Sequence, residues 1–258
     1  MSRLLLKLRA TSDTRYEMEY HKDIQGLIYA LLRDSEYDVH EKRGFKFFTF
    51  SNIFPFYDLK RNDKRNLLIS SPQDNFISYL KEQLEYLPDI RIGSMSFKLE
   101  YCRKLILHVS DNPSLITATP IICNIHRYRF EQAGVLHLVN DHAAAYWRSK
   151  YPVDLFLKQV EANFMKKYNA YLGLGVSTAA DVDIESNEPV PLFYRSRFLK
   201  QVAIPLSMGQ DRYRHVAIGT NWLFGITDPK LARFALDVGL GELNSLGFGF
   251  MNLLGDTN

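Results

Sequence analysis

Cysteine is scarce in this sequence, which contains two in 258 residues, Cys102 and Cys123. Neither belongs to a Cys-x-x-Cys pair or to a Cys/His cluster with the spacing of a zinc site. Each lies in an apolar or mixed run that is typical of a strand. The simplest interpretation is therefore two buried free thiols.

Long apolar runs are also missing. No run approaches the ~20 residues that a membrane-spanning helix needs. The segment Met1 to Leu8 carries Arg3 and Lys7, and it lacks the apolar stretch of a signal peptide. We therefore expect a cytoplasmic protein that has no membrane partner.

The excess of positive charge is small: the formal net charge is only +3, and the sequence pI is about 8.7. Such a balance permits nucleic-acid binding without requiring it. Aromatic residues are plentiful, with 15 Tyr and 17 Phe, so some are free to stack on unpaired bases. The length suits one large or two small domains.

The first part of the chain shows a β-α-β-β-α-β pattern, which is the ferredoxin-like order shared by RNA-recognition modules. Ser71-Pro72 is expected to cap the second helix, with Pro at its first position, and Pro88 to end it. The last segment is expected to form one long strand or a bent pair of strands. The ranges are strand 3–9, helix 20–33, strand 45–50, strand 66–70, a helix through 76–87, and strand 91–108.

The second part is expected to repeat the ferredoxin-like pattern with elaborated hairpins. Asp228-Pro229 is expected to cap its second helix. The ranges are a hairpin of 119–126 with 134–138, helix 153–172, a polar loop over 173–191, paired strands 193–206 and 212–219, a helix through 232–238, and a last strand near 248–254. The sequence thus predicts an α+β protein of two tandem ferredoxin-like (RRM-like) domains, residues 1–116 and 117–258.

The most specific segment is Gly239-Leu-Gly241-Glu-Leu-Asn-Ser-Leu-Gly247-Phe-Gly249-Phe250, with four of the 14 glycines in eleven residues. Such a loop favours either a phosphate or RNA contact through exposed N–H groups, or a tight turn packed between two domains. A dinucleotide site is disfavoured, because that fingerprint follows a strand and opens a helix, whereas here a helix precedes and a strand follows.

This string resembles the C-terminal glycine-rich signature of the repeat-associated mysterious protein superfamily, and more narrowly of the CRISPR-associated pre-crRNA endoribonucleases. Two further parts of the chain resemble the same family, and they occur in the same order along the sequence as in the family. Gln25-Gly-Leu-Ile-Tyr29-Ala and His40-Glu-Lys-Arg-Gly44-Phe-Lys46-Phe-Phe-Thr49-Phe-Ser51 are similar to the family's first helix and the segment after it, and Thr119-Pro120-Ile121 to the start of its second domain. The resemblance therefore covers nearly the whole chain.

The resemblance implies two ferredoxin-like domains, binding of CRISPR repeat RNA (pre-crRNA), and one cut per repeat without a metal or cofactor. The 2′-hydroxyl attacks the adjacent phosphate, which leaves a 2′,3′-cyclic phosphate and a 5′-hydroxyl. Tyr29, His40 and Lys46 match the family's catalytic positions. His40 is assigned as general base or general acid, Lys46 as stabiliser of the transition state, and Tyr29 as an orienting group with a share in acid–base work. The sequence does not separate the acid from the base.

Other residues compete for these roles or add RNA contacts. His21 begins the first expected helix, from which it could face the same junction, and it is a weaker catalytic candidate. His126 belongs to a basic cluster that is better suited to contact the RNA backbone. A further basic group, Lys60-Arg61 with Lys64-Arg65, is interpreted most simply as an exposed hairpin tip. The expected RNA contacts are Arg127, Arg129, Arg195, Arg197, Lys200, Gly239, Gly241, Asn244, Ser245, Gly247 and Gly249.

The main alternative is an RNA-binding protein of the same architecture that does not cut, such as a structural subunit of a CRISPR effector complex. The joint presence of His40 and Lys46 favours the enzyme. An effector complex and a second copy of this chain are further candidate partners.

Overall fold

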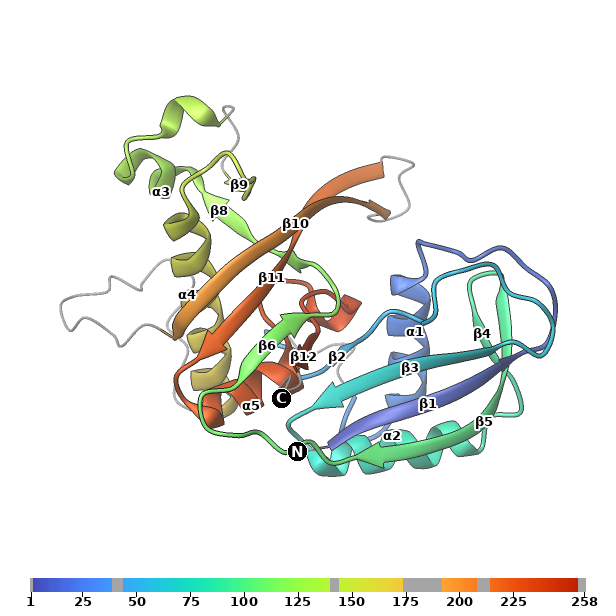
Figure 1. Cartoon of the computed structure of the whole chain (residues 1–258). Coiled ribbons are helices and arrows are strands. Elements are labelled where there is room, and N and C mark those ends of the chain that lie inside the picture. The colour runs from blue at the N-terminus through green and yellow to red at the C-terminus, as the bar shows by residue number, and fades with distance from the viewer. Residues whose placement is uncertain (1, 39–43, 140–143, 174–191, 208–213, 255–258) are drawn as a thin grey trace.

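A computed structural model describes residues 2–38, 44–139, 144–173, 192–207 and 214–254. They form two α+β units side by side, with the N-terminal unit on the right of Figure 1. In the described part of the chain, no helix is both long enough and apolar enough to cross a membrane.

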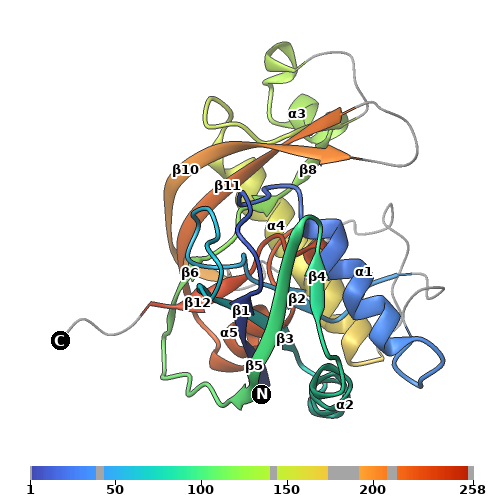
Figure 2. The ribbon, with the colours of Figure 1, turned by 90° about the vertical axis from the view of Figure 1, so that its right-hand side faces the viewer.

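The first unit is a five-stranded antiparallel sheet with the strand order β2-β3-β1-β5-β4. Apart from the added edge strand β4, this is the ferredoxin-like order. Helices α1 and α2 lie on the same side of the sheet, as Figure 2 shows. The elements are β1 (Ser2–Ala10), α1 (His21–Leu32), β2 (Thr49–Phe50), β3 (Lys64–Ser71), α2 (Asp74–Glu85), β4 (Ile90–Ile92) and β5 (Met95–Leu105).

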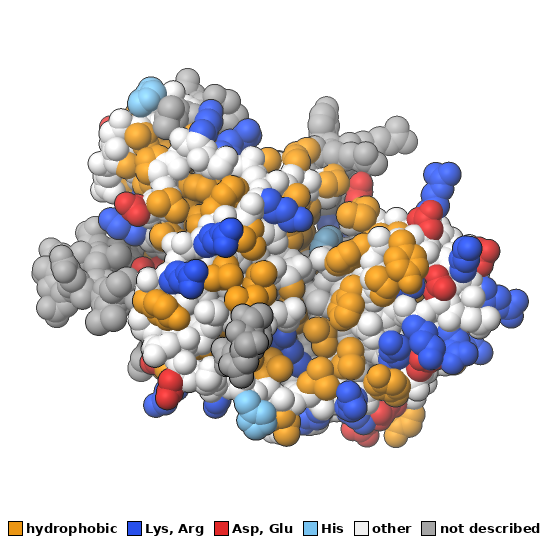
Figure 3. Space-filling view, in the orientation of Figure 1, with side chains coloured by type: hydrophobic (Ala, Val, Ile, Leu, Met, Phe, Trp, Pro, Cys, Tyr) orange, Lys and Arg blue, Asp and Glu red, His pale blue; other side chains and the backbone are white. Residues whose placement is uncertain are grey.

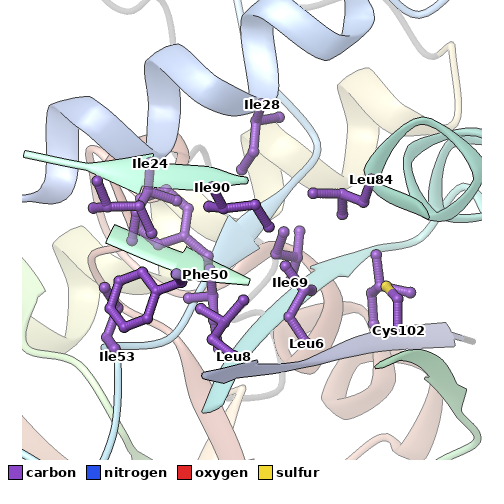
Figure 4. Close-up of a cluster of buried hydrophobic side chains, with 14 of the residues drawn as sticks. Leu6, Leu8, Ile24, Ile28, Phe50, Ile53, Ile69, Leu84, Ile90 and Cys102 are labelled. Atoms are coloured by element: carbon purple, nitrogen blue, oxygen red, sulfur yellow. The ribbon is translucent and has the colours of Figure 1, made fainter. Parts of the chain in front are cut away.

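The core of this unit fills the space between the sheet and the two helices. Alternate residues of β1, such as Leu6 and Leu8, point toward Ile24 and Ile28 of α1, as Figure 4 shows. Each of these side chains is at most 1% exposed, and burial of this kind stabilises a fold by ~1.5–3 kcal/mol per side chain. The other face of β1 carries Lys7 and Arg9.

The second unit has the strand order β10-β11-β6-β12, which is the same arrangement. Its elaborations are the segment from β7 to β9, inserted between β6 and α4, and a loop between α5 and β12 (Figure 1). The elements are β6 (Ser114–Thr117), β7 (Ile121–Ile122), β8 (Asn124–His126), α3 (Arg127–Gln132), η1 (Leu136–Leu138), β9 (Ala144–Tyr146), α4 (Val153–Tyr171), β10 (Phe193–Ser207), β11 (Arg214–Ile226), α5 (Pro229–Val238), η2 (Asn244–Leu246) and β12 (Met251–Leu253).

The two ferredoxin-like units are thus confirmed, and the strands β1 and β3 and the helices α1 and α4 lie where the sequence predicts them. The pairing of β10 with β11 is also confirmed, but β11 continues to Ile226, beyond the expected end at residue 219. The cap of α5 is also confirmed, because the Asp228 side chain accepts a hydrogen bond of 2.6 Å from the backbone N–H of Lys230. The expected division after residue 116 falls within β6, which belongs to the second sheet. The expected loop over 173–191 lies almost wholly outside the described residues.

Three local predictions are wrong. Residues 134–138 do not pair with 119–126; β8 pairs instead with β9, and residues 127–132 form a helix. The α2 helix begins at Asp74, because Ser71 accepts from the N–H of Gln73 in a turn and donates to the carbonyl of Phe47.

The third error concerns the segment 45–50, of which only β2 is a strand. Within this short strand, Thr49 and Phe50 pair with Ser70 and Ile69 of β3. The expected strand 91–108 resolves into the hairpin β4–β5, so the bent pair is the correct alternative.

Arg3 joins the two units. Its guanidinium donates to the side chain of Asn252 at 2.6 Å and to the backbone carbonyls of Leu236 and Met251. It also stacks 4.4 Å from the centre of the Phe250 ring. Nearby, burial raises the pKa of the Asp237 carboxyl to about 7, although the charges of Arg3 and Arg233 oppose that shift. The units therefore meet through buried polar contacts as well as apolar ones.

Candidate functional site

The glycine-rich loop (residues 239–250) lies where the two units meet. It follows α5, contains η2 and leads into β12. The Phe248 ring lies 4.5 Å from the His21 imidazole of α1, centre to centre. Gly247 faces the Phe50 ring of β2 so closely that an added Cβ would overlap it. The loop is therefore a wall of the junction and touches the first unit directly.

Lys167 of α4 holds the loop from the second unit. Its ammonium is buried and donates to the carbonyls of Gly239 and Gly241, at 3.2 and 2.8 Å, and to Asn244 Oδ1 at 2.5 Å. Three acceptors match the three protons of a charged lysine. Burial lowers the pKa of Lys167 to about 7, and the charge of Glu242 opposes that shift.

The loop's own groups complete its shape. Asn244 donates from Nδ2 to the carbonyls of Leu240 and Phe248, at 3.0 and 2.8 Å. Gly249 has a φ of +68°, and a Cβ at this position would overlap the carbonyl oxygen of Leu240. Only glycine meets both conditions without strain.

The glycines of the loop are buried, and their N–H groups are largely used within the chain. Gly239, Gly247 and Gly249 donate to the carbonyls of Ala235, Asn244 and Pro120, at 2.8–2.9 Å. Such N–H groups do not form an open nest for phosphate. Of the two interpretations open from the sequence, this placement agrees with a tight turn packed between the units.

Ser245 carries the loop onto α1. The amide of Gln25 donates to the backbone oxygen and the hydroxyl of Ser245, at 3.1 and 3.0 Å. The Ser245 side chain is also hydrogen-bonded to Tyr29, which lies one turn further along α1 on the same face. The structure therefore brings together Tyr29 and Ser245, two residues that the sequence singles out from opposite ends of the chain.

Tyr29 is half-buried where α1 meets Ser245 of the glycine-rich loop, a place that we call the corner. Its ring packs against Phe48 with centroids 6.2 Å apart and an interplanar angle of 75°. Burial raises the pKa of the Tyr29 hydroxyl, while its hydrogen bond to Ser245 acts in the opposite direction. The group is thus a protonated phenol at neutral pH, able to donate a hydrogen bond.

Lys46 lies on the segment before β2, two residues before Phe48. Phe47 packs toward Tyr171 of α4 at 5.5 Å, and Phe48 packs toward Tyr29, so the two rings fix this segment between α1 and α4. Lys46 is half-buried directly before them. His40 lies outside the described residues.

His21 does face the junction. Its imidazole packs against Tyr20 and Phe248 and is hydrogen-bonded to the backbone of Leu246. Burial lowers the pKa of His21 to about 4. A neutral imidazole here is poorly suited to protonate a leaving group at neutral pH, although it helps to seat the loop.

Arg127 and Arg129 lie on α3, in the inserted segment. This segment is tied to the glycine-rich loop because Glu242 accepts from the N–H and the side-chain amide of Asn124, both at 3.0 Å. The guanidinium of Arg129 donates to the hydroxyl of the half-exposed Tyr128 at 3.2 Å. Three consecutive side chains thus present cations and an aromatic ring on the inserted segment.

Arg195, Arg197 and Lys200 lie on β10, and all three are exposed. β10 is an edge strand, and β11 and β6 separate it from β12. These residues are therefore not at the corner with Tyr29. Lys200 pairs with Asn221, beside the point where β11 meets β7.

The basic residues between positions 60 and 65 differ in their exposure to solvent. The Arg65 side chain is fully buried and donates to the carbonyls of Tyr57, Asp58 and Lys64. It therefore contributes to the fold, whereas Lys60, Arg61 and Lys64 are exposed. Where residues are described, no three His, Cys, Asp or Glu side chains gather as they would around a metal ion.

Sequence reasoning missed Lys167 and passed over the contact role of Gln25. A signal for Lys167 was present, because it falls in register with Phe156, Val160 and Phe164 on the apolar face of α4. A lone lysine on such a face needs buried acceptors, and backbone carbonyls in positive-φ turns can supply them.

Residues 109–253 match the family model described as "CRISPR associated protein Cas6, C-terminal". The chain is 28% identical over 264 residues to a CRISPR-associated endoribonuclease Cas6 of Haloferax mediterranei, covering 99% of this chain and 94% of that protein. It is 29% identical over 263 residues to a CRISPR-associated endoribonuclease Cas6 2 of Methanocaldococcus jannaschii, covering 97% and 98%. A solved structure described as "An RAMP protein binding different RNA substrates" has the same fold, with a TM-score of 0.71, 19% identity and coverage of 99% and 100%.

Proposed function

Because the chain belongs to the Cas6 family of CRISPR-associated proteins, we propose that it is an endoribonuclease that binds CRISPR repeat RNA and cuts it once in each repeat. The two curated relatives carry the name endoribonuclease and match over nearly their whole length. The observation that carries the proposal is the shared hydrogen bonding of Ser245 with Gln25 and Tyr29, which joins the glycine-rich loop to the corner of α1.

The proposed reaction is attack of a ribose 2′-hydroxyl on the adjacent phosphorus. A base takes the 2′-OH proton, the bond from phosphorus to the 5′ oxygen breaks, and an acid protonates that oxygen. The products are a 2′,3′-cyclic phosphate and a 5′-hydroxyl. In this proposal, side chains supply the acid, the base and the cation, and no metal takes part. Correctly placed acid and base groups each contribute ~10²–10⁴ in rate.

His40, Lys46 and Tyr29 are proposed as the groups that act on this linkage. His40 serves as general base or general acid because its ordinary pKa is close to neutral. The Lys46 ammonium stabilises the negative charge that grows on the phosphoryl oxygens. The Tyr29 phenol, oriented by Ser245 and Phe48, donates a hydrogen bond to the same phosphate or to the leaving oxygen.

For RNA binding, the loop and the cations take different roles in this proposal. The buried residues Gly239, Gly241, Asn244, Gly247 and Gly249 shape the wall, and the half-exposed Ser245 faces the RNA. Phosphates are bound by the cations of α3 and β10, which makes affinity depend on salt. These cations are Arg127, Arg129, Arg195, Arg197 and Lys200.

The test is incubation of the protein with a repeat RNA in EDTA, followed by mass spectrometry of the product ends. We expect one cut per repeat with a cyclic-phosphate end, and no cut when the ribose at that position is 2′-deoxy. Tight binding without any product would instead favour the non-cutting RNA-binding protein.

His40→Ala separates catalysis from binding. We expect a strong loss of cleavage rate at saturating protein, while the RNA dissociation constant stays nearly unchanged. If the cleavage rate and the RNA affinity fall together, residue 40 has a binding or folding role.

An effector complex and a second copy of the chain are proposed as further partners. Light scattering with and without RNA tests whether the chain forms a dimer.

A further inference from the structure

A basic hollow lies at the end of the first unit that is remote from the glycine-rich loop. It has a volume of about 560 Å³, and its wall includes Arg9, Arg61, Arg91 and Lys98. The fold brings these residues together, because Arg9 and Lys98 are register partners on β1 and β5. The turn that carries Arg61 is tied to β1 by a hydrogen bond of 2.8 Å from Asn62 N–H to the carbonyl of Ala10. We call this feature the distal basic hollow.

Positive charge in the distal basic hollow is not balanced by the protein. Asp89 is the one acidic residue in the wall. Two more carboxylates adjoin it: Glu100 pairs with Arg9, and Asp13 accepts from the backbone N–H of Arg61 at 2.7 Å. Even with all three counted, the four cations of the wall outnumber the carboxylates. Neither Arg61 nor Lys98 has an acidic partner within ion-pair distance among the residues that the structure describes. Like charges held this close repel one another, and an anionic ligand relieves that repulsion.

The face of the sheet between the hollow and the domain junction has the character of a single-stranded RNA platform. Tyr101 of β5 is 46% exposed and is the register partner of Lys7. The guanidinium of Arg103 lies 6.0 Å from the centre of its ring. Figure 3 shows Lys and Arg side chains gathered on this part of the N-terminal unit, among apolar side chains. An exposed ring between cations suits a stacked base with phosphates on either side.

Geometry then sets the size of the ligand. Arg3, at the junction, and Arg9, at the hollow, are six residues apart on one strand, which corresponds to ~20 Å at the rise of a β-strand. A single phosphate or mononucleotide bound at the junction does not span that separation. A single-stranded RNA several nucleotides long does, and it carries a phosphate at every step.

We propose that the distal basic hollow binds phosphates of an unpaired segment of the substrate RNA, several nucleotides away from the linkage that is cut. The inference rests on the proposed function, because it assigns a second contact region to the same RNA. Arg61 and Lys98 are the cations we assign to that RNA, because Arg9 is held by Glu100 and Arg91 donates to the backbone carbonyl of Gly93 at 3.2 Å.

The test compares two RNAs and two double variants. One RNA is a short repeat fragment around the cut linkage, and the other is a full repeat with flanking nucleotides on both sides. The test variant is Arg61→Ala with Lys98→Ala. The matched control is Lys81→Ala with Lys158→Ala, which removes the same charge from α2 and from the outer side of α4.

We expect the test variant to bind the long RNA at least tenfold more weakly, with the control and the short fragment unaffected. Each lost phosphate contact lowers the slope of log K against log salt by ~0.7 for a single strand, so the long-RNA slope falls by ~1.4. The single-turnover rate at saturating protein stays unchanged, because neither residue lies at the proposed catalytic corner.

Equal weakening of the short fragment, equal weakening by the control, or no weakening of the long RNA overturns the proposal. If RNA affinity is unchanged but binding of pyrophosphate alone is abolished, the hollow is a small-anion site and the RNA assignment is wrong. Failure of the proposed function is seen separately, as absence of cleavage of either RNA by the unmodified protein. Absence of any RNA binding overturns both.

Discussion

The two ferredoxin-like units share a strand order but differ in their connections. In the N-terminal unit, the connection from α2 to the last central strand is a short hairpin, β4–β5, with one positive-φ glycine, Gly93. In the C-terminal unit, the same connection is the glycine-rich loop, held by a buried lysine. One scaffold therefore serves two purposes in this protein. The N-terminal unit presents the proposed catalytic side chains, and the C-terminal unit builds the wall that positions them.

Lys46→Met gives the largest expected effect and tests the role of the N-terminal unit. We expect the single-turnover cleavage rate to fall ~10²–10³-fold, because a transition-state cation is lost. The RNA dissociation constant should rise by only a few-fold, since methionine keeps the apolar stem. Rate at saturating protein and filter binding measure the two quantities. A parallel rise of the dissociation constant would show that Lys46 binds RNA in the ground state.

Gly249→Ala tests the wall by comparison with Gly93→Ala in the matched connection. Both glycines have positive φ, but a Cβ at Gly249 overlaps the backbone carbonyl of Leu240, whereas a Cβ at Gly93 meets the flexible end of Glu17. We expect Gly249→Ala to lower the unfolding free energy by ~3 kcal/mol or more, and Gly93→Ala by ~1 kcal/mol. Denaturant unfolding measures both. Equal losses would contradict a rigid, tightly packed loop.

Lys167→Met removes the ammonium that holds the loop and keeps the length of the side chain. Three acceptors lose their donor, while the cost of burying a charge is relieved, so we expect a net loss of ~1–3 kcal/mol in stability. RNA affinity should fall with it, because Ser245 is no longer fixed against α1. Lys158→Met, on the exposed side of the same helix, is the control and should change neither quantity.

Asp237→Asn is expected to give the smallest effect. It should change how stability depends on pH, because Asp237 lies at the interface between the units. The pKa of Asp237 is raised to about 7 in the folded chain, so the folded chain keeps a proton that the unfolded chain releases near 4. Its contribution to stability is therefore present below about pH 4 and is lost as the pH rises to 7. Thermal unfolding from pH 5 to 8 should show this decline in the unmodified protein, and a weaker decline in the variant.

The fold was largely predictable because its elements have local signals. The apolar period of α1 and α4, the alternation in β1 and the Asp228-Pro229 cap each depend on neighbouring residues only. The β8–β9 pairing was not predictable in this way, because its strands are separated by α3 and η1 and joined by contacts that no local pattern encodes. The same holds for Ser71, whose hydroxyl bonds to Phe47, 24 residues away in sequence.

The candidate site was also predictable only in part. The resemblance identified Tyr29, Lys46 and Ser245, but it did not reveal that Ser245 is hydrogen-bonded to α1. It also did not reveal that the glycines turn their carbonyls toward Lys167. The loop itself can be recognised from its glycine-rich composition. Lys167, which holds the loop, lies on a helix more than 70 residues away in sequence, so no local pattern links the two.

The cut linkage is proposed to lie between α1 and the glycine-rich loop. This location can be mapped by placing one photo-reactive 4-thiouridine next to the cut in a repeat RNA blocked by a 2′-deoxy ribose, and by identifying the cross-linked peptides. We expect cross-links to peptides from both units, one containing residues 25–29 or 44–48 and the other residues 242–246. Cross-links confined to the outer face of α2 or to the edge strand β10 would contradict it.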